Sequence, residues 1–337
     1  MTSAAAGVAA AIDRRGTLRR LVRRHGWTIG VYLLLLALVL YWRGQTKLPW
    51  GPFDVQSLAI DALPFAFAAC GQAVVILSGG IDLSVGSLMS LANVVSAKYM
   101  LHMSFTQALL FSLAVIAGSA LAGALTGLVT VVTRVADIIV TLAMLFVWAG
   151  AALAVLQVPG GGAPLRYQNL VQFDTVLTKW LPSAIAILLV AYAVLWLTVR
   201  RTKPGLGLYA IGSSRSAAYL AGVHVSRSRI LAYAYSGLFA GLGGLALTAA
   251  SGIGDPNAGS IYTLNSVAAV VLGGVSLLGG VGGLIGPIGA AFVLTLVKTL
   301  MILKGVNQNY AQVFQGALIV LVVMVGGLAI RQKGKGT

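Results

Sequence analysis

The sequence predicts an all-α polytopic membrane protein with about ten transmembrane helices, and three properties of the chain predict it. Hydrophobic residues make up 58% of the 337 positions and charged residues only 9%, a composition that a soluble domain does not have. The 42 glycines are typical of membrane helices that pack closely. The apolar residues occur in runs of roughly the 17–25 residues that cross a bilayer.

The apolar runs predict an ordered set of spans that leaves both termini in the cytoplasm. The first is short, and Trp27, Tyr41 and Trp42 are placed to anchor it at the membrane interfaces. Most of the 23 Lys and Arg residues fall on the side that this order makes cytoplasmic, as the positive-inside rule requires. The predicted spans are 27–42, 57–78, 84–101, 107–133, 137–157, 181–199, 228–251, 263–279, 284–303 and 312–330.

The segments between and around the spans complete the predicted organisation. Residues 1–26 are expected to form a basic cytoplasmic segment, 27–330 the transmembrane domain, and 331–337 a basic cytoplasmic tail. The first apolar run lacks a small-residue cleavage pattern, so we interpret it as an uncleaved anchor. The stretch 158–180 is expected to be an outer loop. The basic stretch 200–229 is expected to lie in the cytoplasm, with a short surface helix near 213–222.

The net charge of +16 raises the question of nucleic acid as a partner. The basic residues lie at the ends of the apolar runs and are not interleaved with aromatic residues on a soluble face. Membrane insertion explains this distribution. We therefore expect membrane lipid, and no nucleic acid, as a partner.

The segment 79–87 is the most informative part of the chain, because it places Asp82, Ser84 and Ser87 among three glycines inside an apolar sequence. A carboxylate at the centre of a bilayer costs at least about 2.5 kcal/mol, so it normally faces protein or water. Glycine-broken backbone at membrane depth is tolerated beside a cavity or inside protein. Two interpretations of Asp82 remain open, a cap for the next helix and a contact with a transported solute.

A weaker echo of this segment occurs later in the chain, where 270–276 resembles 75–81. Glycine-interrupted segments in two halves of a transporter indicate its pathway, and close helix packing explains the second copy equally well.

Other polar residues in or near the spans are weaker candidates for the pathway. Asn93, Tyr262 and Asn265 have groups that hydrogen-bond a sugar, although interface anchoring and helix–helix bonds explain such residues too. Asp61 is a lone acid just before a proline. Asp137 follows Arg134 by three residues, which predicts a local ion pair between them.

No catalytic set emerges from the sequence, and no metal site is predicted. The three histidines are scattered, and Cys70 is the only cysteine, so it is interpreted as a small packing residue. The chain contains no G-x-x-x-x-G-K-[ST] motif for phosphate binding. If ATP drives this protein, another subunit must bind the ATP.

Four stretches of the chain resemble the membrane subunit of ribose-, xylose- and galactose-type ABC importers. The first, which contains Gly79 to Ser87, is the most specific. The four stretches are 71–87, 137–144 with Gly150, 202–212 with 217–223, and 264–274 with the glycines at 279, 280, 282 and 286.

The resemblance implies a permease subunit of the bacterial inner membrane that is not itself an enzyme and imports a monosaccharide. The implied partners are cytoplasmic ABC ATPase subunits that hold ATP and Mg, an extracytoplasmic sugar-binding protein, and a second permease copy or a paralogue. The implied ATPase-coupling residues are Gly212, Ser213, Ala217, Ala218 and Gly222. The alternatives are a permease of the same superfamily for nucleosides or branched-chain amino acids, and a proton-coupled carrier that uses Asp61 or Asp82.

Overall fold

The protein is mainly helical in the residues that its computed structural model describes, which are 26–45, 51–176, 178–197 and 200–307, with 309–311, 313, 314, 316, 317, 320 and 324. In these residues the β-structure is limited to two isolated bridges. Six of the described helices are long and apolar enough to cross a membrane. The all-α membrane fold is thus confirmed. Ten spans and cytoplasmic termini stay predictions, since residues 1–25, 331–337 and most of 312–330 lie outside the described part.

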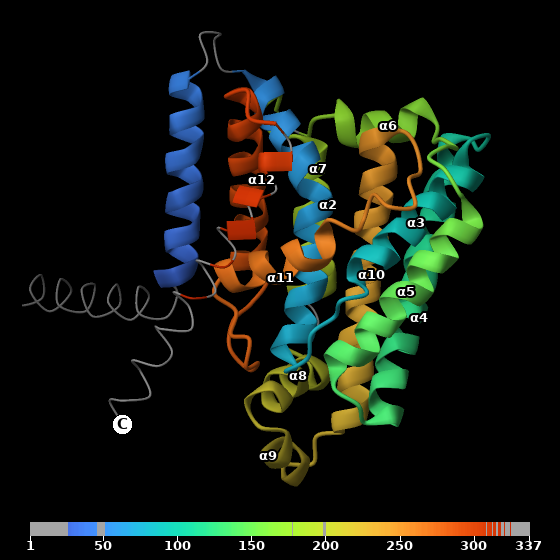
Figure 1. The fold of residues 1–337 in the computed structure, drawn as a ribbon, viewed down its shortest axis with the longest axis vertical. Coiled ribbons are helices and arrows are strands. Elements are labelled where there is room, and N and C mark those ends of the chain that lie inside the picture. The colour runs from blue at the N-terminus through green and yellow to red at the C-terminus, as the bar shows by residue number, and fades with distance from the viewer. Residues whose placement is uncertain are drawn as a thin grey trace, which may run out of the picture.

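The helices follow the predicted order closely (Figure 1). In chain order they are Gly26–Gln45, α2 (Pro52–Leu77), α3 (Val85–Met100), α4 (Phe105–Thr133), α5 (Asp137–Val155), α6 (Leu165–Gln172), α7 (Ser183–Ala191), the π-helix η1 (Tyr192–Leu197), α8 (Lys203–Ser213), α9 (Arg215–Leu220), α10 (Val225–Ser251), α11 (Tyr262–Leu272) and α12 (Ile285–Leu303). The stretch 158–180, predicted as a loop, contains α6.

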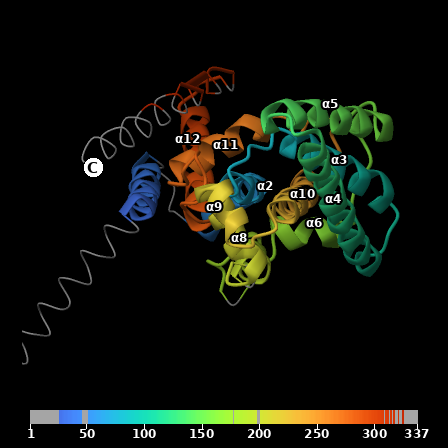
Figure 2. The same cartoon turned by 90° about the horizontal axis from the view of Figure 1, so that it is seen from below.

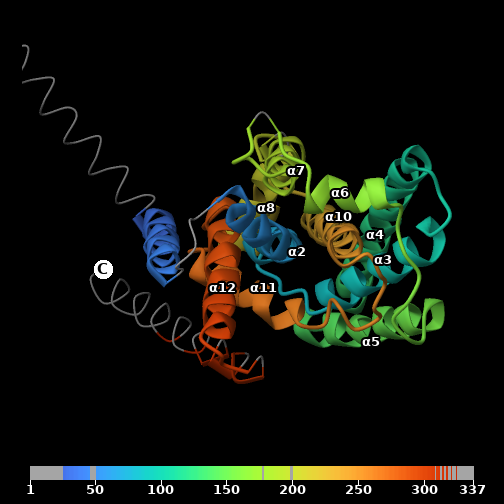
Figure 3. The same cartoon turned by 90° about the horizontal axis from the view of Figure 1, so that it is seen from above.

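The core of the molecule is built around α2 and α10, which the other helices surround in the views from below and above (Figures 2 and 3). In the most apolar stretch of α2, 89% of the residues are buried, against 22% in α5 and 11% in the helix Gly26–Gln45. In water the outer helices would leave large apolar faces exposed. In a membrane these faces contact lipid, so the burial pattern fits the predicted environment.

Small residues bring α4 and α10 into backbone contact. A Cβ atom on Gly123 would clash with the carbonyl oxygen of Tyr233, and one on Gly237 would clash with that of Ser119. Because lipid is as apolar as the helix surfaces, such close packing is the main force that holds membrane helices together. Gly123 and Gly237 therefore permit the close approach of α4 and α10.

One span is shorter than predicted because a glycine turn ends its helix, and another begins beside a break in the chain. The span predicted at 263–279 is α11, which ends at Leu272 where Gly274 adopts a left-handed conformation with φ of 82°. The span predicted at 84–101 is α3, which confirms the prediction to within one residue at each end, and its start follows a non-helical stretch from Gly80 to Asp82 and a turn. Both helices therefore begin or end inside the bundle, as Figure 1 shows.

The stretch 200–229 forms two short helices, α8 and α9, where the sequence predicted one. Each begins at a hydroxyl cap, since Thr202 accepts from the backbone N–H of Gly205 and Ser214 from that of Ala217. Together they form the end of the molecule opposite α6 (Figure 1). The predicted short helix is α9.

Candidate transport pathway

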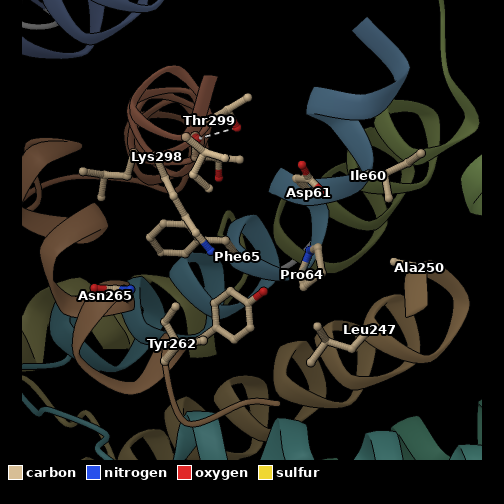
Figure 4. Close-up of a pocket in the computed structure, with 14 residues that line it drawn as sticks. Ile60, Asp61, Pro64, Phe65, Leu247, Ala250, Tyr262, Asn265, Lys298 and Thr299 are labelled. Carbon is tan, nitrogen blue, oxygen red and sulfur yellow. Dashed lines mark hydrogen bonds between the residues drawn. The ribbon is translucent and has the colours of Figure 1, made fainter. Parts of the chain in front are cut away.

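A cavity of about 250 Å³ lies between α2, α10, α11 and α12 (Figure 4). The rings of Phe65 and Tyr262 form part of its apolar wall, with centroids 5.8 Å apart at an angle of 51°. Its polar lining carries a carboxylate, an ammonium group, an amide and several hydroxyls. The polar lining residues are Asp61, Tyr262, Asn265, Thr295, Lys298 and Thr299.

A second cavity of about 240 Å³ adjoins the first, with Ile60, Asp61 and Ala250 in both linings. It extends to Phe53 at the start of α2 and to Gln172 on α6. The two cavities thus lead from the α6 end of the molecule to the middle of the helix bundle. This is the arrangement expected of a solute pathway that opens toward one side of a membrane.

Two of the predicted pathway residues, Tyr262 and Asn265, line the inner cavity together with Asp61. Lys298 lines it as well, and sequence reasoning did not select this residue. The signal was present, because Lys298 is a lone cation inside the apolar run 284–303, and an ionisable residue inside a span marks a pathway by default.

Asp82 is enclosed by protein and lies outside both cavity linings, with 2% of its surface exposed. Its Oδ1 accepts from the backbone N–H of Ser84 at 2.8 Å and from the Ser84 hydroxyl at 2.6 Å. Its Oδ2 accepts from the Ser236 hydroxyl of α10 at 2.7 Å. Ser84, whose carbonyl accepts from the Ser87 hydroxyl, is the N-cap residue of α3. Asp82 therefore forms a turn just before the helix and ties it to α10.

Gln72 of α2 fixes the backbone of the same segment. With its amide oriented so that both polar atoms are paired, the side chain donates to the Asp82 carbonyl at 2.7 Å and accepts from the Asp82 N–H at 3.3 Å. The broken backbone at membrane depth is thus satisfied by side chains from α2 and α10.

Asn93 also lies outside the cavity linings, and its contacts are structural. Its Nδ2 donates to the Thr248 hydroxyl at 2.9 Å and to the Ile253 carbonyl at 3.2 Å. Its Oδ1 accepts from the backbone N–H of Asp255 at 2.7 Å. The side chain thereby ties α3 to the end of α10.

The sequence echo between 75–81 and 270–276 corresponds to a repeated helix end. Gly79 and Gly274 both adopt left-handed conformations, with φ of 78° and 82°. In each copy a backbone N–H bonds back to the carbonyl five residues earlier, from Gly80 to Val75 at 3.1 Å and from Val275 to Val270 at 3.1 Å. This pattern is the Schellman motif. The sequence similarity between the two segments thus reflects the same type of backbone break in two places.

The helices α8 and α9 contact the first break, and α8 also contacts the loop that follows the second break. A Cβ atom on Gly212 would clash with the Leu77 carbonyl oxygen and with the N–H of Gly280, and that N–H donates to the Leu77 carbonyl at 3.0 Å. Arg215 donates to the Gly79 carbonyl at 3.2 Å, and the Tyr209 hydroxyl donates to the Gly282 carbonyl at 3.2 Å.

The predicted coupling residues divide between two environments. Gly212 lies against the end of α2 and, with Ser213, against Gly280 in the loop before α12, and Ala218 of α9 is buried. Ala217 is exposed, and Gly222 has open space around it. Beside them two apolar side chains, Tyr219 and Leu220, are 73% and 85% exposed.

The predicted ion pair between Asp137 and Arg134 is wrong. Asp137 pairs with Arg229 of α10 and accepts from the Tyr233 hydroxyl at 3.1 Å. Arg134 is exposed and ends α4 in a left-handed conformation with φ of 57°. Three-residue spacing brings side chains together only within one helix, and Arg134 and Asp137 belong to different helices.

The chain matches known transport permeases over most of its length. A family model described as "Branched-chain amino acid transport system / permease component" matches residues 54–323. The ribose import permease protein RbsC of Escherichia coli (strain K12) is 33% identical over 268 residues, which are 77% of this chain and 81% of that protein.

Relatives named for other solutes match to a similar extent. The autoinducer 2 import system permease protein LsrC of Enterobacter sp. (strain 638) is 34% identical over 264 residues, 77% of this chain and 74% of that protein. The fructose import permease protein FrcC of Rhizobium meliloti is 32% identical over 267 residues, 75% of this chain and 72% of that protein. No solved structure shows a significant match.

These matches confirm the resemblance to ribose-type import permeases. The matched residues 54–323 include both cavity linings, both glycine breaks and the helices α8 and α9. With six helices able to span a membrane in the described residues alone, the protein is a multi-pass permease of the bacterial inner membrane. The chain belongs to the family of branched-chain amino acid transport system permease components.

Proposed function

We propose that this chain is the membrane subunit of an ATP-driven importer, and that it translocates a monosaccharide delivered by an extracytoplasmic binding protein. The observation that carries the proposal is the polar cavity among α2, α11 and α12, which adjoins a second cavity that reaches the α6 end. The predicted topology makes this end extracytoplasmic. The relatives named for ribose and fructose support a sugar as the solute.

The lining of the cavity suits a small polyhydroxylated solute. Hydroxyl, amide and charged groups offer both donors and acceptors, and the Phe65 and Tyr262 rings offer an apolar surface to a sugar ring.

The ATPase is proposed to be a separate pair of subunits, because the sequence has no phosphate-binding loop. The exposed apolar side chains of α9 and its place at the end of the molecule support α8 and α9 as the docking site. ATP binding would move these helices and alternate the access of the pathway. A second permease copy or a paralogue would complete the membrane part.

Purification of the tagged chain from its native membranes in a gentle detergent, followed by mass spectrometry, tests this proposal. We expect a co-purifying protein with a Walker A motif and, after addition of the loaded binding protein, ATP-dependent sugar uptake in proteoliposomes. Uptake by the chain alone would overturn the proposal.

A proton-coupled carrier is the second candidate function, because Asp61 lines the cavity. Asp82 supports it less, since its carboxylate is enclosed and bonded to Ser84 and Ser236. A carrier would transport without an ATPase and would stop when an uncoupler removes the proton gradient. Uptake of nucleosides and branched-chain amino acids by the same proteoliposomes tests the alternative solutes.

A further inference from the structure

We propose that Asp61 and Lys298 recognise the transported solute, as an acceptor and a donor placed on two different helices of one cavity. This inference rests on the proposed function and deepens it. Asp61 belongs to α2 and Lys298 to α12. Figure 4 shows the Lys298 side chain reaching from α12 toward Phe65, with Asp61 on the neighbouring part of α2.

Neither charge belongs to an ion pair in the described part of the chain, although Lys298 acts on Asp61 electrostatically from the neighbouring helix. The ion pairs within the described part of the chain join Arg166 to Asp174 and Arg229 to Asp137, and neither Asp61 nor Lys298 lies within 4.0 Å of an opposite charge. Their neighbour Thr299 is paired, because its hydroxyl donates to the Thr295 carbonyl at 3.1 Å.

Two unpaired charges within a transmembrane bundle do not stabilise the fold. Ionisable groups at this depth normally pair with each other or face a water-filled pathway, and in the pathway they bind what passes. Asp61 is exposed and Lys298 half-buried, so both are accessible to a solute from the cavity.

The chemistry of the pair narrows the class of solute, since a neutral polyol and an amino-acid zwitterion can each satisfy both charges, and L-leucine is therefore one of the probes below. A carboxylate only accepts hydrogen bonds and an ammonium group only donates them, whereas each hydroxyl of a polyol can do both. A neutral polyhydroxylated ring therefore satisfies Asp61 and Lys298 together, through strong charge-assisted bonds. A simple anion would be repelled by Asp61 and a simple cation by Lys298. Phe65, 4% exposed, and Tyr262 would contact the apolar face of the ring.

Lys298→Met and Asp61→Asn test the inference, because each removes one charge and keeps the approximate shape of the side chain. The matched controls are Lys304→Met, at the exposed end of α12, and Asp54→Asn, in the first turn of α2. Neither control residue lines a cavity. Each variant is reconstituted with the co-purified ATPase and saturating loaded binding protein, so that the uptake rate reports the permease.

With D-ribose, D-fructose and L-leucine as probes, we expect sugar uptake to fall about tenfold in each cavity variant, equivalent to about 1.4 kcal/mol. Uptake by the controls stays within about twofold of the wild type. A deoxy sugar that lacks the hydroxyl bonded by one of the two charges should be taken up more slowly than the full sugar by the wild type. In the variant that lacks this charge the two sugars should be taken up at similar rates, since the two changes remove the same bond. The melting midpoint in detergent stays about equal, because neither charge has an ion-paired partner within 4.0 Å to lose.

Three results would overturn the inference. Unchanged sugar uptake in both cavity variants would show that the charges do not act on the solute, while the proposed function survives. A lowered melting midpoint, or full recovery in the swapped variant Asp61→Lys with Lys298→Asp, would show that the charges serve the fold or only each other. Uptake of L-leucine and of neither sugar by the wild type would overturn both the polyhydroxylated solute and the proposed function.

Discussion

The pair between Asp137 and Arg229 holds the glycine break in place, and Arg229→Met tests this. Asp137, at the start of α5, also accepts from the Tyr233 hydroxyl. A Cβ atom on Gly80 would lie 2.5 Å from Asp137 Oδ2 and 3.1 Å from the Tyr233 hydroxyl. The ion pair therefore packs directly against the non-helical segment that leads to α3.

The size of the effect follows from the burial of the pair. The Arg229 and Asp137 side chains are 11% and 13% exposed, so the loss lies near the lower limit for a buried pair, about 3 kcal/mol. The Nε atom of Arg229 is buried without a hydrogen-bond partner, and its removal returns about 1 kcal/mol. We expect Arg229→Met to lower the free energy of unfolding by about 2 kcal/mol.

Equilibrium unfolding by sodium dodecyl sulfate in mixed micelles measures this loss. Arg227→Met, on an exposed position of the same helix, and Arg134→Met should change stability by less than about 0.5 kcal/mol. The double variant with Asp137→Asn should cost less than the sum of its two parts, because both parts remove the same interaction. A loss in Arg134→Met as large as that in Arg229→Met, or full additivity in the double variant, would refute the reasoning.

Three further outcomes concern the breaks and the helices at the α9 end. Asp82→Ala should reduce uptake severalfold while the ATPase still binds, because three bonds that fix the break are lost; normal uptake would contradict the assignment. Gly212→Ala should reduce uptake and should lower the free energy of unfolding by about 1–3 kcal/mol, since the added Cβ clashes with two backbone segments. Unchanged uptake and stability would show that this contact is not essential. Ala217→Glu with Gly222→Glu should leave ATP hydrolysis uncoupled from uptake, and normal sugar uptake would reject α9 as the coupling element.

Most of the fold was readable from the sequence, because the need to bury every backbone polar group inside a bilayer leaves helices as the main solution. Runs of apolar residues therefore located the long helices to within a few residues. The failures have local causes. Gly274 ended α11 early through a left-handed turn that hydropathy does not report, and the helix α8, which begins at the hydroxyl cap Thr202, was not predicted beside α9.

The candidate pathway was only partly readable. Tyr262 and Asn265 line the cavity, whereas Asp82 and Asn93 satisfy backbone and side-chain groups of the break and of α10. A polar residue in a span either lines a pathway or bonds to groups in the packed interior. Which of the two it does depends on the side of the helix on which it lies. That orientation is set by contacts between α2, α10 and α11, far apart in sequence, so single-residue reasoning could not supply it.

The contacts of α8 connect the end that carries α9 to the cavity. Gly212 lies directly against the Leu77 carbonyl of α2 and the Gly280 N–H in the loop before α12, with no side chain between them. Backbones in direct contact cannot move independently, because packed interiors yield little to compression. We expect a displacement of α8 to be shared by α2 and α12, the helices that hold Asp61 and Lys298. Movement of α8 would then alter the separation of Asp61 and Lys298 and so the affinity for the solute. Binding of a partner to α9 would thereby be linked to transport.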